Sequence, residues 1–108
     1  FRRLRRSADD HGIVIASLFT AHRELGGFFR REPEWTEVAR RNYERYIAIG
    51  AILGAESTGS NPGAVMRDEM EDKAAGTARY IAHMKELMAT AKQAGLRRLT
   101  IEPMSCLA

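Results

Sequence analysis

Polar side chains able to do chemistry follow short runs of this sequence that have the composition of strands. Glu102 comes directly after the run LRRLTI and directly before Pro103. In α/β folds substrates bind at the carboxyl ends of the strands, and a carboxylate placed there can take up or release a proton. Glu102 is therefore the first candidate for chemistry. The alternative is a carboxylate that merely caps the strand end or pairs with Arg97 or Arg98.

Weaker candidates follow this run and two earlier runs of strand composition, IVIASLF and AESTGS. They are Thr20 and His22 after IVIASLF, Ser60, Asn61 and Arg67 at or after the end of AESTGS, and Ser105 after LRRLTI. All of them could line a substrate pocket. The imidazole of His22 could be a ligand, a proton carrier or only a loop side chain. Arg67 could hold a substrate phosphate in a bidentate contact, or it could be an ordinary solvated arginine.

Three glycines at nearly equal intervals indicate which elements position these residues. Gly12, Gly54 and Gly95 each precede a short run of strand composition, and a segment with helical periodicity fills each interval of about 40 residues. Antiparallel strands can be joined by a tight turn, whereas parallel strands need a crossover of a dozen or more residues. The spacing therefore predicts repeated βα units with parallel strands.

The element boundaries follow from local signals. Ile13 to Phe19 is a continuous apolar run, which predicts a first strand covered on both faces. Pro33 opens a helix that ends at Gly54, and 55–60 is the second strand. The turn 61–63 and the polar segment 67–73 follow, and the next helix closes at Gly95. The predicted buried stripes of the two helices are Trp35, Ala39, Tyr43, Tyr46, Gly50 and Leu53, and Thr77, Ile81, Met84, Met88 and Ala91.

Length and composition restrict the class of protein. The 108 residues suffice for one domain, whereas a closed eight-stranded α/β barrel needs about 250. We therefore expect 1–108 to be an internal fragment, which would aggregate or remain molten in isolation because side chains such as Phe28 and Phe29 stay uncovered. No membrane span or signal peptide is evident, and the single Cys106 fits a reducing cytoplasm.

The charge pattern argues against nucleic acid as a partner. The net charge of +3 comes from fourteen arginines and three lysines set against 14 acidic residues. The arginine pairs fall on different predicted elements, are interleaved with acids and lack aromatic platforms. We therefore expect no nucleic-acid and no membrane partner, and association with copies of itself stays open.

The order of motifs resembles one known family. The runs HGIVIASLFTAH, YERY with a helix ending in LGA, STGSNPG and ARYIAHMKELMATAKQAGLRRLTIEPM look like the middle of a sugar phosphate isomerase/epimerase. These proteins are xylose-isomerase-like TIM barrels related to the tagatose and psicose 3-epimerases. The resemblance covers essentially all 108 residues, and its sharpest motif is Ile101-Glu102-Pro103. It implies an α/β fold, a partial (β/α)8 TIM barrel with about three parallel strands and two to three helices.

The resemblance also implies a reaction. It identifies Glu102 as both a ligand of a divalent metal and the group that moves a proton next to a carbonyl, through an enediolate. Oxygen ligands and imidazole suit Mn²⁺, Mg²⁺ or Co²⁺, with Zn²⁺ a further option. The substrate would be a sugar or sugar phosphate, whose hydroxyls Thr20, His22, Ser60, Asn61 and Ser105 could match. The family's remaining ligands, an Asp, a His and a second Glu, come from later strands, so 1–108 alone should be inactive.

Two other function classes remain open. An endonuclease IV-like phosphodiesterase would share the barrel but needs histidines from early strands, and the second strand here ends in Ser60-Asn61-Pro62. A non-catalytic α/β binding module would have the fold without the chemistry. The sequence does not distinguish epimerisation from aldose–ketose isomerisation.

Overall fold

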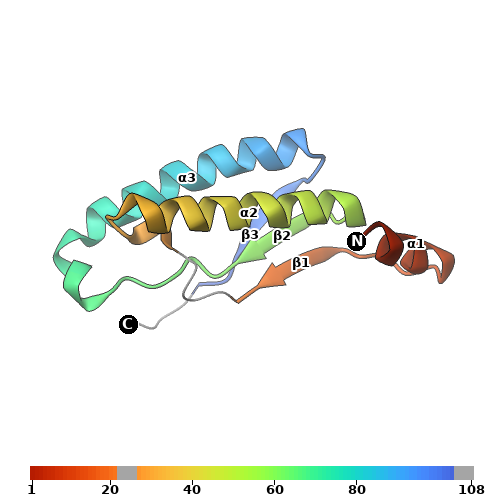
Figure 1. The fold of residues 1–108 in the computed structure, drawn as a ribbon, viewed down its shortest axis with the longest axis horizontal. Coiled ribbons are helices and arrows are strands. Elements are labelled where there is room, and N and C mark those ends of the chain that lie inside the picture. Colours follow the sequence, from red (N-terminus) through yellow and green to blue (C-terminus); the bar gives the residue numbers. More distant parts are fainter. Residues whose placement is uncertain (22–26, 104–108) are drawn as a thin grey trace.

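The computed structural model describes residues 1–21 and 27–103, which form a mixed α/β structure (Figure 1). The elements are α1 (Arg2–Asp10), β1 (Ser17–Thr20), η1 (Gly27–Phe29), α2 (Pro33–Leu53), β2 (Ser57–Ser60), η2 (Arg67–Asp72), α3 (Lys73–Gln93) and β3 (Arg98–Ile101), where η denotes a 3₁₀-helix. No described helix combines the length and the apolar character that crossing a membrane requires.

The three strands form one parallel sheet in the order β1-β2-β3, as the glycine spacing predicts. Thr20 pairs with Ser60, and Ser60 pairs with Ile101, so the carboxyl ends of all three strands meet at one edge. The helices α2 and α3 contact each other as well as the strands, so both cover the same face of the sheet (Figure 1). Among the described elements, none covers the other face.

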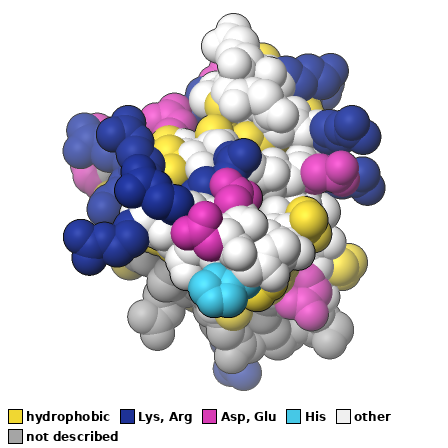
Figure 2. Space-filling view, turned by 90° about the vertical axis from the view of Figure 1, so that its right-hand side faces the viewer, with side chains coloured by type: hydrophobic (Ala, Val, Ile, Leu, Met, Phe, Trp, Pro, Cys, Tyr) yellow, Lys and Arg dark blue, Asp and Glu magenta, His cyan; other side chains and the backbone are white. Residues whose placement is uncertain are grey.

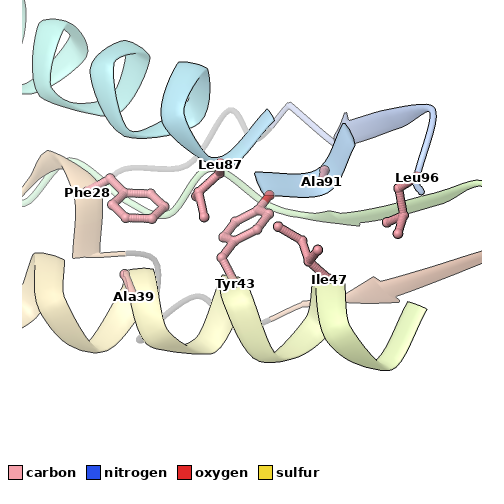
Figure 3. Packing of buried hydrophobic residues seen from close by; sticks show 7 residues of the cluster. All are labelled: Phe28, Ala39, Tyr43, Ile47, Leu87, Ala91 and Leu96. Carbon is pink, nitrogen blue, oxygen red and sulfur yellow. The ribbon is translucent and has the colours of Figure 1, made fainter. Parts of the chain in front are cut away.

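The core lies between α2, α3 and the covered face of the sheet (Figure 3). Its buried members are Phe28, Ala39, Tyr43, Ile47, Leu87, Ala91 and Leu96. Phe28 is 1% exposed and inserts between the two helices at one end of the cluster. The expectation that this ring stays uncovered is therefore wrong, because η1 folds back onto both helices.

Glycine and proline set the helix boundaries where the sequence predicts them. Pro33 occupies the first turn of α2, where its missing N–H leaves no hydrogen bond unmade. Gly54 ends this helix with φ of 72°, in the left-handed region that a side chain disfavours. Gly12 and Gly95 also have positive φ, of 67° and 96°. All three repeat glycines therefore reverse the chain just ahead of a strand.

The first strand is shorter than predicted. It begins at Ser17, and Val14 in the apolar run before it is 84% exposed. The strand is short because its pairing with β2 is short. The backbone hydrogen bonds between the two strands begin where the Glu56 N–H donates to the carbonyl of Ala16. The strand is also not covered on both faces, since its residues alternate between exposed and half-buried. The second strand likewise begins late, at Ser57.

The predicted helix stripes are partly out of phase. In α2 the predicted Ala39, Tyr43, Gly50 and Leu53 are buried, but Ile47 is buried in place of the half-buried Tyr46, and Trp35 is 46% exposed. In α3 the predicted Ala91 is buried, but Leu87 is buried as well, whereas Thr77 is exposed and Ile81 is 47% exposed. A 3.6-residue period allows two neighbouring stripes on a helix, and only the position of the partner helix decides between them.

Candidate functional site

The candidate site lies at the carboxyl ends of the strands, where Asn61 and Glu102 follow β2 and β3. The backbone N–H of Glu102 donates to the carbonyl of Ser60 at 3.3 Å, which extends the β2–β3 ladder by one step. Asn61 is 7% exposed, and its Nδ2 donates to Glu102 Oε2 at 3.1 Å. An ionised carboxylate only accepts hydrogen bonds, so the amide nitrogen must face it. Asn61 therefore fixes the direction of the Glu102 side chain.

Glu102 opens onto a shallow hollow on the uncovered face of the sheet. This hollow has a volume of about 400 Å³ and is lined by Phe19, Thr100, Ile101, Glu102 and Pro103. Glu102 is exposed, and its second oxygen, Oε1, has no partner among the described residues. A carboxylate with one oxygen held and one oxygen open can accept a proton or serve as one ligand of a cation.

Thr20 and Ser60 lie in a different cavity, behind the strand ends. It is lined by Thr20, Phe28, Ala39, Asn42, Tyr43, Tyr46, Gly59, Ser60, Asn61 and Pro62. It offers about 20 Å³ to water-sized molecules, which is enough for a water and not for a sugar. The Ser60 hydroxyl donates to the backbone oxygen of Asn61 at 2.9 Å. The structure therefore joins Asn61 with Glu102 but places Thr20 and Ser60 toward the helices.

The remaining predicted site residues are not brought to this hollow. Arg67 is exposed at the start of η2 and lines neither of the two cavities. His22 and Ser105 lie outside the described residues.

Arg97 and Arg98 do not pair with Glu102. They lie at the opposite end of the sheet, 3.8 Å and 3.5 Å from the carboxylate oxygens of Glu56. Figure 2 views the end of the molecule that carries α1, where Lys and Arg side chains form separate groups with Asp and Glu side chains between them. The alternative of Glu102 as a mere ion-pair partner of Arg97 or Arg98 is therefore wrong.

The sequence analysis missed a loop clamp, formed by Arg30, Arg31, Glu69, Asp72 and Arg79. Glu69 is 5% exposed, and its Oε1 accepts the backbone N–H of Arg31 at 3.1 Å. Its Oε2 lies 3.6 Å from the Arg30 guanidinium. Arg79 in α3 donates to the carbonyl of Phe29 at 2.7 Å. The clamp therefore holds η1, which follows β1, against η2 and α3.

Next to the clamp lies an aromatic cluster formed by Phe28, Tyr43, Tyr80 and His83. The Phe28 ring stacks on His83 with centroids 4.7 Å apart and lies 5.9 Å from the ring of Tyr43. Burial raises the pKa of Tyr80 to about 12 and raises that of Tyr43 further. Both phenols therefore stay neutral near pH 7. Burial is also the main cause that lowers the pKa of His83, with the Arg40 charge adding to it and Glu86 opposing it.

The described residues contain no group of three or more His, Cys, Asp or Glu side chains able to hold a metal ion. Glu102 offers a single carboxylate, which fits one position of a larger ligand set. No protein-family model matches this chain, and a comparison with curated proteins finds no relative.

Proposed function

We propose that the chain is part of a (β/α)8 barrel. Two βα units, β1–α2 and β2–α3, are followed by β3 with each strand beside the next, and the described helices α2 and α3 cover one face only. A doubly wound open sheet places helices on both faces, whereas a barrel keeps them all outside. The uncovered face would then be the inside of the barrel. Further strands would have to complete it, because a barrel of this type has eight.

Within that barrel we propose a carbohydrate isomerase or epimerase that moves a proton next to a carbonyl. The observation that carries the proposal is the Glu102 carboxylate, which opens onto the uncovered face at the end of β3 with one oxygen held by Asn61. A general base must reach its proton directly or through one water, and a fixed carboxylate meets that requirement better than a free one. Asn61 would act as the positioning residue.

The proposed reaction calls for a divalent metal, and Glu102 would supply one ligand. The open oxygen of an exposed carboxylate is a hard donor that suits Mn²⁺, Mg²⁺ or Co²⁺, and Zn²⁺ less specifically. The metal, when bound, would stabilise negative charge on the oxygen next to the carbon that loses its proton. With Oε1 given to the metal, Glu102 would take up and return the proton at Oε2, which keeps a lone pair beside the Asn61 hydrogen bond. The ligands beyond Glu102 would come from outside the described residues.

The test is deuterium wash-in by the full-length protein. Ketohexoses and ketohexose phosphates are incubated in deuterated water with Mn²⁺, Mg²⁺ or Co²⁺, and deuterium at the carbon beside the carbonyl is measured by NMR. Glu102→Gln keeps the size of the side chain but removes the base, so turnover should fall at least about a hundredfold. Glu56→Gln is the matched control, because this exposed carboxylate lies at the other end of the sheet. It should exchange deuterium like the native protein.

Two results would contradict the proposal. Normal wash-in by Glu102→Gln would mean that another residue moves the proton. Absence of wash-in by the native protein with every ketose and every metal would remove the isomerase assignment altogether.

A further inference from the structure

The end of β2 carries a serine side chain that the proposed reaction does not use. Ser60 is 6% exposed, and it lines the small cavity behind the strand ends rather than the hollow. Ser60 therefore does not act directly on a ligand in the hollow. Its carbonyl and its hydroxyl nevertheless make two hydrogen bonds beside the site, one with Glu102 and one with Asn61.

The first of these bonds holds the backbone of Glu102. The carbonyl of Ser60 accepts the Glu102 N–H at 3.3 Å, one step beyond the pairing of Ser60 with Ile101. This bond fixes where the Glu102 side chain starts. It leaves the direction of the side chain open, because a glutamate has several rotatable bonds with alternative staggered positions. The direction comes from Asn61, whose Nδ2 donates to Glu102 Oε2 at 3.1 Å.

The second bond holds the backbone of Asn61. The Ser60 hydroxyl donates to the Asn61 carbonyl at 2.9 Å, and this bond is buried. The peptide that follows Asn61 has no N–H, because the next residue is Pro62. A hydrogen bond can therefore hold the plane of this peptide only through its carbonyl, and the Ser60 hydroxyl supplies the donor. Pro62 also restricts the backbone of Asn61 to extended conformations.

We propose that Ser60 is a positioning residue for Glu102 and acts through Asn61. The inference rests on the proposed function for the reaction at Glu102 and adds the residue that keeps its partner in place. The chain of hydrogen bonds runs from the Ser60 hydroxyl to the Asn61 backbone, and from the Asn61 amide to Glu102 Oε2. Without the hydroxyl the Asn61 peptide can tilt, so its side chain no longer holds Glu102 in the fixed direction that proton transfer requires.

The first test measures the hydrogen bond between Asn61 and Glu102 in the full-length protein and needs no reaction. The Nδ2 protons of Asn61 report this bond by NMR, because a bond to an ionised carboxylate is stronger than one to water and moves the proton resonance to lower field. Glu102→Ala removes the acceptor and defines the resonance of the released amide. Ser60→Ala should shift the same protons toward that value. Ser57→Ala is the matched control and should leave them unchanged, because Ser57 is also 6% exposed but lies at the amino end of β2.

The second test measures deuterium wash-in through a double-mutant cycle. Ser60→Ala should lower turnover about two- to tenfold, the range that corresponds to one hydrogen bond, and Ser60→Thr, which keeps the hydroxyl, should retain most of the native rate. In an Asn61→Ala background, Ser60→Ala should have no further effect on turnover, because the residue through which it acts is already missing. A merely structural role of Ser60 would lower turnover equally in both backgrounds.

Two results would overturn the inference: an Asn61 resonance that stays unchanged in Ser60→Ala, and losses of turnover that add up in the cycle. If Ser60→Ala does not fold, Ser60→Cys replaces it. The thiol is a weak donor, so this variant should give an intermediate shift, and an unchanged resonance would contradict the inference in the same way. A shifted Asn61 resonance in Ser60→Ala, together with no wash-in from any ketose by the native protein, would uphold the role of Ser60 while the proposed reaction fails.

Discussion

Two carboxylates in the loops after the strands differ in their surroundings. Glu69 is 5% exposed, accepts a backbone N–H from Arg31 and lies 3.6 Å from the Arg30 guanidinium. Glu102 is exposed and is held at one oxygen only, by Asn61. A buried carboxylate that lies against a backbone N–H and a guanidinium is costly to remove from them, whereas an exposed one with an open oxygen is free to meet a ligand. The comparison separates a structural region, the loop clamp with its aromatic cluster, from a region available for chemistry, the hollow.

The sharpest test of this separation compares two phenylalanines. Phe28 in the clamped region is 1% exposed, so Phe28→Ala should lower the free energy of unfolding by about 4 kcal/mol. Phe19 in the hollow is 48% exposed, and Phe19→Ala should cost less than about 1 kcal/mol. Denaturant titration of the full-length protein measures both. Equal losses would mean that the uncovered face is packed as tightly as the core.

A second test compares the two carboxylates themselves. Glu69→Ala removes the partner of a largely buried guanidinium and of a backbone N–H, so we expect a loss of about 3 kcal/mol in unfolding free energy. Glu69→Gln keeps an acceptor for Arg31 and should recover part of that loss. Glu102→Ala should leave unfolding nearly unchanged. A large stability loss for Glu102→Ala would assign this residue to the structural region as well.

The smallest expected effect concerns pH. Burial lowers the pKa of His83, so the unfolded chain takes up the proton more readily than the folded one. Stability should therefore be fully present above pH about 6.5 and fall as the pH drops from there through the lowered pKa of His83. Since the side chain is only half-buried, the loss should stay below about 1 kcal/mol. His83→Gln should flatten this part of the curve of stability against pH, and an unchanged curve would contradict the assignment to His83.

Local signals predicted the scaffold of the candidate site. Gly12, Gly54 and Gly95 marked the repeats, and their positive φ values explain why glycine is needed there. Pro33 fixed the start of α2, and the position of Glu102 followed from the end of the third run. Each of these features, a turn, a helix start or a strand end, is determined by a few neighbouring residues, so it can be predicted from the sequence.

What the sequence could not predict depends on partners far along the chain. Glu69 lies in a polar segment that resembles a solvated loop, and its burial requires Arg30 and Arg31 from another unit. Phe28 is buried because η1 packs against α2 and α3, and Arg79, 50 residues further along the chain than Phe29, donates to the Phe29 carbonyl. Thr20 and Ser60 were predicted to line a substrate pocket with Asn61. Side chains alternate along a strand, so Thr20 and Ser60 point to the helix face, whereas Phe19, the neighbour of Thr20, lines the hollow.

The parallel register has a consequence for how the chain is made. Ser17 pairs with Ser57, so β1 leaves the ribosome 40 residues ahead of the strand that it needs. At about 5–20 residues per second, the first strand spends roughly 2–8 s without its neighbour. An exposed strand edge can pair with other chains in that time, and short strands with polar residues reduce the risk. With only four residues, two of them Ser17 and Thr20, β1 is suited to that delay during synthesis.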